Sequence, residues 1–410
     1  MLFNQSRAND VLAREGLDGL IAATAINQYY LTDYWGLFNS AGGYDGSYFG
    51  LYTPKHSSLI LPALEIRTLE SNSGSWVDEV YSYFTEGEGS FEDGTPQGAE
   101  YKGWQPADEA NLTALEERWM SRVAQLGPNC SPDAFWALTR AAKAAVVTKG
   151  RVAVDDHRIQ GWLALCGVDE ITCVYRPDLF NEIRMVKTPD ELQLMKTAAL
   201  INENSLIAAA NSMRVGQTWD EIESVYMTEM ARQGGKGCYL LCGLGGLPAG
   251  EVRPNEPIFM DALGHFKRYH GDFGRCVVVG EPTDKQLAYH ASILAGWEAA
   301  QELVKPGISY TELSETVGEI VRKSGITTYR NPIVHGVGLE HTDDPKPYGV
   351  MPQTKPDQVL QEGMVINIDF PHTEIGWGSV HMEDTVVITE DGFERLSQSD
   401  FSILVQDAPR

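Results

Sequence analysis

The sequence has little positive charge, few cysteines and no long apolar run. Its 410 residues contain 32 Lys and Arg against 57 Asp and Glu, so the formal net charge is −25 at pH 7. This excess of negative charge argues against nucleic acid or an anionic membrane surface as a partner. No stretch approaches the roughly 20 apolar residues that span a bilayer, so we expect no membrane-embedded segment.

The six cysteines are too few and too irregularly spaced to form a disulfide framework. Cys238 and Cys242 in "CYLLC" are interpreted as packed core thiols rather than as a metal-binding pair. The N-terminal stretch "MLFNQSRANDVLAREGLDG" has no apolar segment of the kind found in a secretory signal, so we expect no such signal. Together these features favour a reducing, cytoplasmic location.

Length and patterning predict at least two domains. A hydrophobic fraction of 43% and a charged fraction of 22% are typical of a soluble globular protein. Residues 1–176 alternate strand-like and helical segments, which favours a small α/β domain. Within it, the acidic, Gly- and Pro-rich segment 85–107 is expected to be a long surface loop. Residues 177–410 are predicted to form a second domain.

The second domain contains an internal repeat. The segments "RVGQTWDEIES" and "KPGISYTELSE" align, and each predicts a helix that begins with a capping box, Thr218 with Glu221 and Ser309 with Glu312. Strand-like runs follow each copy. Two related halves, each made of helices and strands, would bring their strands together about a pseudo-twofold axis.

The strands of both halves carry acidic side chains that strands ordinarily disfavour. Asp261 and Asp272 lie in the first half, and Asp369 and Glu383 lie in the second. His335 follows an apolar run between them. Carboxylates that converge in a buried place repel one another unless cations lie between them. A two-metal site with a bridging water activated as hydroxide satisfies this requirement.

These residues resemble the signatures of the creatinase/aminopeptidase family, the "pita-bread" metalloenzymes that include methionine aminopeptidase, prolidase and aminopeptidase P. The first signature has two Asp residues eleven apart, a Tyr three before the second and an Arg three after it. This chain matches it with Asp261, Tyr269, Asp272 and Arg275. Four further stretches resemble family motifs in the same order: "IRMVKTPDE", "HGVGL", "GMVINID" and "VHMEDTVVIT". The N-terminal domain resembles the creatinase/prolidase accessory domain in size, position and pattern.

The resemblance implies a mixed α/β (α+β) protein, with an N-terminal creatinase/prolidase-like α/β domain and a C-terminal pita-bread catalytic domain. It implies two divalent ions, Mn, Fe, Co or Zn, and a homodimer. The implied metal ligands are Asp261, Asp272, His335, Asp369 and Glu383. Arg275 would hold a ligand carboxylate in place, and His341 would polarise the substrate or transfer a proton.

The chain departs from the family pattern at three positions. Asp369 stands where the family has Glu, the ligand usually credited as general base. His381 replaces the usual Arg before Glu383, and is expected to be either a catalytic residue or a structural partner of Glu383. His341 follows His335 by six residues where seven is usual, although the spacing from His335 to Pro345 is preserved.

The leading functional hypothesis is a metallohydrolase that cleaves C–N bonds of a small peptide or amide with a metal-bound hydroxide, as Xaa-Pro dipeptidases and aminopeptidases do. The departures at Asp369 and His381 favour an alternative in the same fold, a creatinase-like amidinohydrolase or a dimethylsulfoniopropionate lyase-like C–S lyase. A metal-free binding module is a third reading. It is disfavoured because every ligand position keeps a side chain able to bind metal.

Overall fold

The chain forms two compact units, Met1–Arg184 and Met185–Arg410. The computed structural model describes residues 1–42, 46–71, 74–84, 90–92, 95–97, 100–344 and 357–407. The boundary drawn from the sequence falls at the start of helix α8 (Pro177–Met185), which belongs almost entirely to the first unit. There Arg7 donates a hydrogen bond to the backbone carbonyl of Glu182 in this helix.

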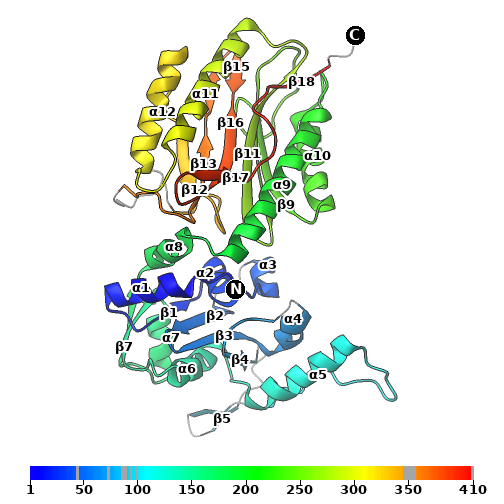
Figure 1. Cartoon of the computed structure of the whole chain (residues 1–410). Coiled ribbons are helices and arrows are strands. Elements are labelled where there is room, and N and C mark those ends of the chain that lie inside the picture. The colour runs from blue at the N-terminus through cyan, green and yellow to red at the C-terminus, as the bar shows by residue number, and fades with distance from the viewer. Residues whose placement is uncertain are drawn as a thin grey trace. The chain divides into compact units, whose positions relative to one another are not determined.

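The N-terminal unit contains a six-stranded sheet (Figure 1). In spatial order its strands are β4 (Glu79–Tyr83), β3 (His56–Pro62), β2 (Phe49–Thr53), β1 (Gly19–Ala22), β7 (Gly150–Val154) and β8 (Ile171–Tyr175). Strand β1 pairs with β7, and β7 with β8, in parallel, whereas β2 pairs with both its neighbours in antiparallel fashion. The sheet is therefore mixed, as the alternation of strands and helices predicted.

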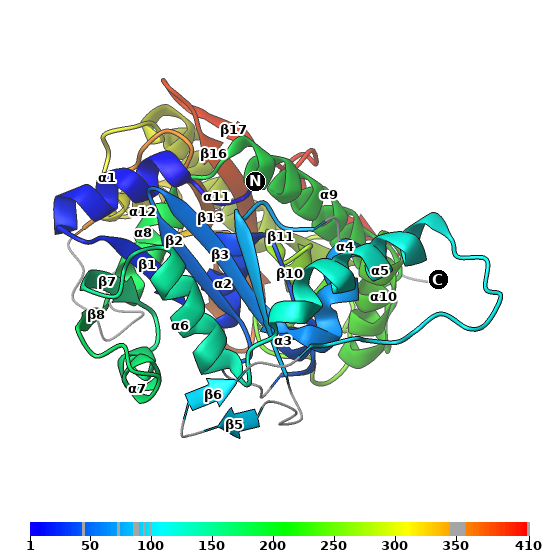
Figure 2. The ribbon, with the colours of Figure 1, turned by 90° about the horizontal axis from the view of Figure 1, so that it is seen from below.

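Helices cover this sheet, and α6 (Ala134–Ala144) lies across β2, β3 and β4 (Figure 2). The other helices of this unit besides α8 are α1 (Gln5–Glu15), α2 (Ala25–Thr32), α3 (Leu37–Ala41), α4 (Ile66–Ser71), α5 (Ala114–Leu126), α7 (Ile159–Leu165) and the short 3-10 helices η1 (Ala63–Glu65) and η2 (Gly127–Asn129). The segment expected to be a plain loop contains an antiparallel pair, β5 (Ser90–Glu92) with β6 (Thr95–Gln97), so that prediction is wrong there. Other parts of that segment, 85–89, 93–94 and 98–99, lie outside the described residues.

An eight-stranded sheet dominates the C-terminal unit. Its main path is β12 (Ile333–Gly336), β13 (Val365–Asp369), β16 (Met382–Ile388), β11 (Tyr269–Val279), β10 (Ile258–Phe266) and β9 (Lys236–Gly243), with β17 (Phe393–Arg395) on β16 and β18 (Leu404–Gln406) on β11. A separate small pair is formed by β14 (His372–Glu374) and β15 (Gly378–Val380). Strands β11 and β16 join the two halves of the sheet.

Each half of this sheet has its own pair of helices. Helices α9 (Pro189–Asn211) and α10 (Trp219–Arg232) accompany β9–β11, and α11 (Asp284–Leu303) and α12 (Tyr310–Ser324) accompany β12, β13 and β16 (Figure 1). The capping box predicted for Thr218 and Glu221 is present in both directions. At the second copy only one of the two capping hydrogen bonds forms, the one in which the Glu312 backbone amide donates to Ser309 Oγ.

The two helix pairs bury two apolar cores against the sheet. Met260, Ala262 and Phe273 belong to the core of the first half. Ile368 and Met382 belong to the core of the second half. Because side chains alternate along a strand, the residues next to these in sequence point to the opposite face of the sheet. That face is the one available for a functional site.

None of the described helices is long and apolar enough to cross a membrane. All six cysteines are free and lie in described parts of the chain. Cys242 is buried as expected, but Cys238 is exposed at the irregularity where the register of β9 and β10 shifts, so its interpretation as a core thiol is wrong.

Candidate metal centre

Strand register places the expected ligands on one face of the C-terminal sheet. Asp261 pairs with Gly274 in the neighbouring strand, and Asp272 lies two residues before Gly274, so both carboxylates point the same way. Glu383 pairs with Gly274 from the other side, and Asp369 pairs with Glu383. The four carboxylates therefore meet where β10, β11, β16 and β13 run side by side.

The imidazoles come from β12, from the segment after it and from the residue between β15 and β16. His335 pairs with Asn367, two residues before Asp369, so its side chain joins the same face. Its Nε2 atom lies 3.6 Å from Asp272 Oδ2, and His341 Nε2 lies 3.1 Å from the same oxygen. His381 Nε2 lies 2.6 Å from Asp369 Oδ1 and 3.6 Å from Glu383 Oε2.

Two groups of three side chains have ligand atoms within 4.8 Å of one another. The first consists of Asp272, His335 and His341, and the second of Asp261, His381 and Glu383. Asp369 is joined to the second group through His381. The structure thus brings together all eight predicted site residues except Arg275, which lies behind the ligands.

Several carboxylate oxygens of the cluster have no donor. In the described part of the chain, Asp261 Oδ1, Asp272 Oδ1 and Glu383 Oε2 are buried without a hydrogen bond, and Asp272 Oδ2 faces only the imidazoles of His335 and His341. Buried polar atoms are almost always hydrogen-bonded, and an unpaired buried charge costs several kcal/mol. Oxygen and imidazole donors aimed at one small space are the chemistry that divalent transition metals prefer. The residues present therefore fit a metal centre.

The pKa shifts of the carboxylates also reflect negative charges that are buried close together. Burial, followed by the charge of Asp272, raises the pKa of Asp261 to about 7. Burial and the charge of Asp261 raise the pKa of Glu383 well above its usual range. Burial alone would raise the pKa of Asp272, but the contact with His341 outweighs it and the pKa is lowered.

The imidazoles respond to their nearest carboxylates. For His341, burial lowers the pKa, and the contact with Asp272 more than reverses this, so the pKa is raised. The pKa of His381 is also raised, because the attraction of Asp369 outweighs the effect of burial. Burial dominates at His335 and lowers its pKa, which favours a neutral ring.

Arg275 supports the centre differently from the prediction. Its guanidinium pairs with Asp384 at 3.2 Å and donates to the backbone carbonyl of Glu383 at 2.9 Å. The carboxylate that it holds is therefore that of Asp384, next to the expected ligand Glu383, and not that of the ligand itself. Register explains the correction, because Arg275 pairs with Met382 and points to the helix side, as Asp384 does.

One residue near the centre was not singled out from the sequence. The ring of Tyr239, on β9, lies 6.1 Å from that of His341 in an edge-to-face arrangement. Burial and the charge of Asp261 raise the pKa of the Tyr239 hydroxyl. The only sequence signal was its place in "CYLLC", a strand-like run whose position beside the Asp261 strand emerges from the fold. Pro345, used to judge the spacing after His335, lies outside the described residues.

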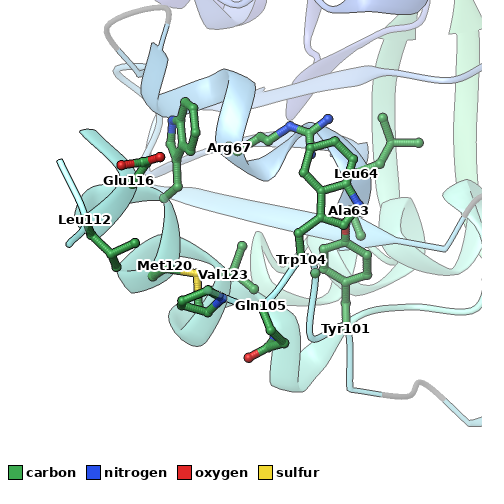
Figure 3. A pocket seen from close by; sticks show the side chains of 13 residues that line it. Ala63, Leu64, Arg67, Tyr101, Trp104, Gln105, Leu112, Glu116, Met120 and Val123 are labelled. Carbon is green, nitrogen blue, oxygen red and sulfur yellow. The ribbon is translucent and has the colours of Figure 1, made fainter. Parts of the chain in front are cut away.

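The N-terminal unit has a pocket of its own, of about 180 Å³ (Figure 3). Tyr101, Trp104 and Met120 line it, and the guanidinium of Arg67 lies 3.5 Å above the Trp104 ring. Its one carboxylate, Glu116, is engaged in the capping box of α5. The pocket therefore provides no group of metal-binding side chains.

Known proteins resemble both the sequence and the fold. Residues 193–390 match the sequence model of metallopeptidase family M24. An Xaa-Pro dipeptidase of Pyrococcus furiosus is 29% identical over 238 residues, which are 55% of this chain and 67% of that protein. An Xaa-Pro dipeptidase of Lactobacillus delbrueckii subsp. lactis is 31% identical over 149 residues, 36% of this chain and 39% of that protein. These alignments thus span two thirds or less of the relatives' length.

Solved structures match almost the whole chain. The prolidase of Pyrococcus horikoshii OT3 aligns with a TM-score of 0.69 and 20% identity, covering 98% of this chain and 99% of that one. An Xaa-Pro dipeptidase from Bacillus anthracis aligns with a TM-score of 0.70 and 18% identity, covering 98% of both chains. These likenesses confirm the predicted fold class, a mixed α/β protein with a pita-bread domain.

The match to metallopeptidase family M24 and the Xaa-Pro dipeptidase relatives, with carboxylates and imidazoles gathered on one face of the sheet, indicate a metallohydrolase. Residues 193–390 thus form a metallopeptidase family M24 domain, and the Xaa-Pro dipeptidase relatives and prolidase structures support a prolidase-like member of the creatinase/aminopeptidase family. The resemblance drawn from the sequence motifs is thereby confirmed.

Proposed function

We propose that this chain hydrolyses the C–N bond of a small peptide, as the related Xaa-Pro dipeptidases are named for doing. The observation that carries the proposal is the convergence of four buried carboxylates, with unpaired oxygens, and three imidazoles on one face of the sheet. The sequence similarity to Xaa-Pro dipeptidases supports a peptide substrate.

In this proposal Asp261, Asp272, His335, Asp369 and Glu383 hold two divalent ions drawn from Mn, Fe, Co and Zn. Support comes from charge, because four carboxylates carry four negative charges, which two divalent cations neutralise. Such ions, when bound, lower the pKa of water and polarise a carbonyl group. The same charge balance explains why the cluster tolerates burial that would otherwise protonate Asp261.

The chain's own residues would then manage protons and orientation. His341 is the most accessible imidazole of the cluster, with 37% of its side chain exposed, so it can contact a substrate. Its Nε2 faces the cluster, and a protonated ring there would donate a hydrogen bond to an oxygen that becomes negative during the reaction. Asp369, whose Oδ1 lies 2.6 Å from His381 Nε2, would accept a proton and pass it to the leaving amine.

The first test is the metal content of purified wild-type protein and of Asp272→Ala, measured by plasma mass spectrometry. About two equivalents in the wild type, lost in the variant, are expected. Asp284→Ala, an exposed carboxylate at the start of α11, is the control and should keep both ions. Wild-type protein that takes up no metal after reconstitution would overturn the proposal.

A substrate panel then tests the reaction. Dipeptides with proline in the second position should be cleaved faster than matched dipeptides without proline. One observation favours a second candidate, a non-peptide reaction such as that of an amidinohydrolase or a C–S lyase: Asp369 and His381 contact each other where the family pattern has Glu and Arg. Turnover of guanidino or sulfonium compounds, without turnover of dipeptides, would select this second candidate.

The family resemblance also supports a homodimer. Light scattering of the protein as it elutes from a size-exclusion column should then give about twice the chain mass of 45.2 kDa.

A further inference from the structure

His381 is held in the orientation that metal-binding histidines adopt. Its Nδ1 atom lies 3.0 Å from the backbone carbonyl oxygen of Met260, which can only accept a hydrogen bond. Nδ1 must therefore carry a proton, and in a neutral ring the lone pair is on Nε2. A backbone carbonyl that fixes one nitrogen while the other faces the metal is the usual support of a ligand histidine.

His335 shows the same arrangement on the other side of the cluster. Its Nδ1 lies 3.1 Å from the backbone carbonyl oxygen of Gly336, and its Nε2 faces Asp272. His381 Nε2 in turn faces Asp369 and Glu383. Each of the two three-residue groups of the cluster therefore contains a histidine whose Nδ1 is occupied by the backbone and whose Nε2 points at carboxylates.

The space around His381 fits its ring closely. The residue is fully buried, and its ring stacks on that of Phe259 with 3.8 Å between the centroids and 9° between the planes. A Cβ on Gly274 would lie 2.0 Å from His381 Cε1, so the imidazole occupies room that only glycine leaves free at this position. The stacking on Phe259 and the absence of a Cβ at residue 274 therefore hold the His381 ring in one orientation.

We infer that His381 is a metal ligand through Nε2, a second supported imidazole that complements the short carboxylate of Asp369. This inference rests on the proposed metal centre and adds to it a nitrogen donor at the position where the family pattern has Arg. Together with Asp261 and Glu383, whose ligand atoms lie within 4.8 Å of its own, His381 completes a three-residue set for one ion.

The added nitrogen changes which metal the centre prefers. Imidazole suits Zn, Fe and other borderline ions, whereas sites made of carboxylate and water suit Mg and Mn. With one supported imidazole for each group, both ions should be borderline metals. We expect zinc or cobalt to bind more tightly than manganese at both positions. Replacement of His381 should reduce this difference in affinity at the position formed with Asp261 and Glu383.

A competing role for His381 is that of a cation. A doubly protonated ring would donate from Nε2 to Asp369 and take the place of the family's arginine without touching metal. The two roles predict different results for His381→Arg. An arginine preserves the charge but cannot bind metal, so it should lose the ion if His381 is a ligand and keep it if His381 only supplies charge.

The test is a titration of metal-free protein with Co²⁺ alone, followed by calorimetry and by the visible absorption of the bound ion. Wild type should bind two ions. His381→Gln and His381→Arg should each weaken one of them by about tenfold or more and change its absorption spectrum. His290→Gln is the control, because His290 is partly buried and also bonded to a backbone carbonyl, that of Phe401, but lies on α11 outside the cluster.

Binding of both ions by His381→Arg with wild-type affinity and spectrum would overturn the inference. If the wild type binds no cobalt, the proposed function itself fails; if it binds two and the His381 variants do as well, only the inference fails. A second measurement needs no change at His381: X-ray absorption of zinc-loaded His341→Gln, which removes the other candidate imidazole. About one imidazole per zinc is expected, and about half of one would also overturn the inference.

Discussion

Replacing Asp261 by Asn should stabilise the metal-free protein while it abolishes metal binding. Asp261 is buried, with 8% of its surface exposed, and its pKa is raised from 3.8 to about 7 by burial and by the charge of Asp272. Since a tenfold change in proton affinity corresponds to about 1.4 kcal/mol, ionised Asp261 costs the metal-free fold about 4 kcal/mol. Asparagine has the same shape and no charge, so it avoids this cost.

The sign of the pH dependence follows from the raised pKa. Between the unfolded pKa and about 7, the folded protein keeps a proton on Asp261 that the unfolded chain has released. The folded state therefore binds more protons, and the stability that Asp261 contributes falls as pH rises through this window. Asp261→Asn should gain about 2 kcal/mol over metal-free wild type at pH 5 and about 4 kcal/mol at pH 8.

Because the chain has two units, the assay must report on the C-terminal one. Hydrogen exchange of peptides from β10 and β11 in chelator-treated protein gives the opening free energy of this sheet. Asp400→Asn is the control within the same unit, since the Ser402 amide lowers the pKa of Asp400 and its replacement should destabilise rather than stabilise at pH 8. A metal-free Asp261→Asn that is less protected than wild type at pH 8 would refute the electrostatic reasoning.

Three further substitutions probe the neighbours of the cluster. Gly274→Ala would place a Cβ 2.0 Å from His381 Cε1 and 2.9 Å from Glu383 Oε2, so it should lower the melting temperature, at a cost of about 1–3 kcal/mol, and lose one of the two metal equivalents on mass spectrometry. His341→Gln should keep both ions by the same measurement but lower kcat by about 100-fold or more, because proton transfer or hydrogen bonding is lost, and an unchanged kcat would exclude that role. The double variant Asp369→Glu with His381→Arg should exceed both single variants in kcat/KM on prolyl dipeptides, since the paired side chains touch, and strictly additive effects would contradict their coupling.

The sequence was sufficient to predict which carboxylates share one face of the sheet, because side chains alternate along a strand with a period of two. Asp261 and Asp272 flank a short turn, and in an antiparallel hairpin the face of each side chain follows from counting residues to that turn. Asp369 and Glu383 belong to a second pair of strands with the same property. The ordered motifs and the internal repeat then indicated that the two pairs adjoin.

What the sequence did not predict depends on which neighbour a side chain meets across strands. Arg275 was expected to hold a ligand carboxylate, but its position opposite Met382 turns it to the face shared with Asp384. Tyr239 comes near His341 only because β9 lies on the outer side of β10. Neither pairing leaves a mark in the local sequence, because both are set by strand order.

Asp369, His381 and Gly274, at the junction of the two half-sheets, act together. Asp369 is one methylene shorter than the Glu of the family pattern, and its Oδ1 meets His381 Nε2 at 2.6 Å. The imidazole in turn fits only because residue 274 has no Cβ. Taken singly, each residue would weaken a metal centre: the carboxylate loses reach, the histidine replaces a cation, and the glycine loosens a strand. Taken together they keep a donor directed at the cluster, and so the double variant should recover what each single change loses.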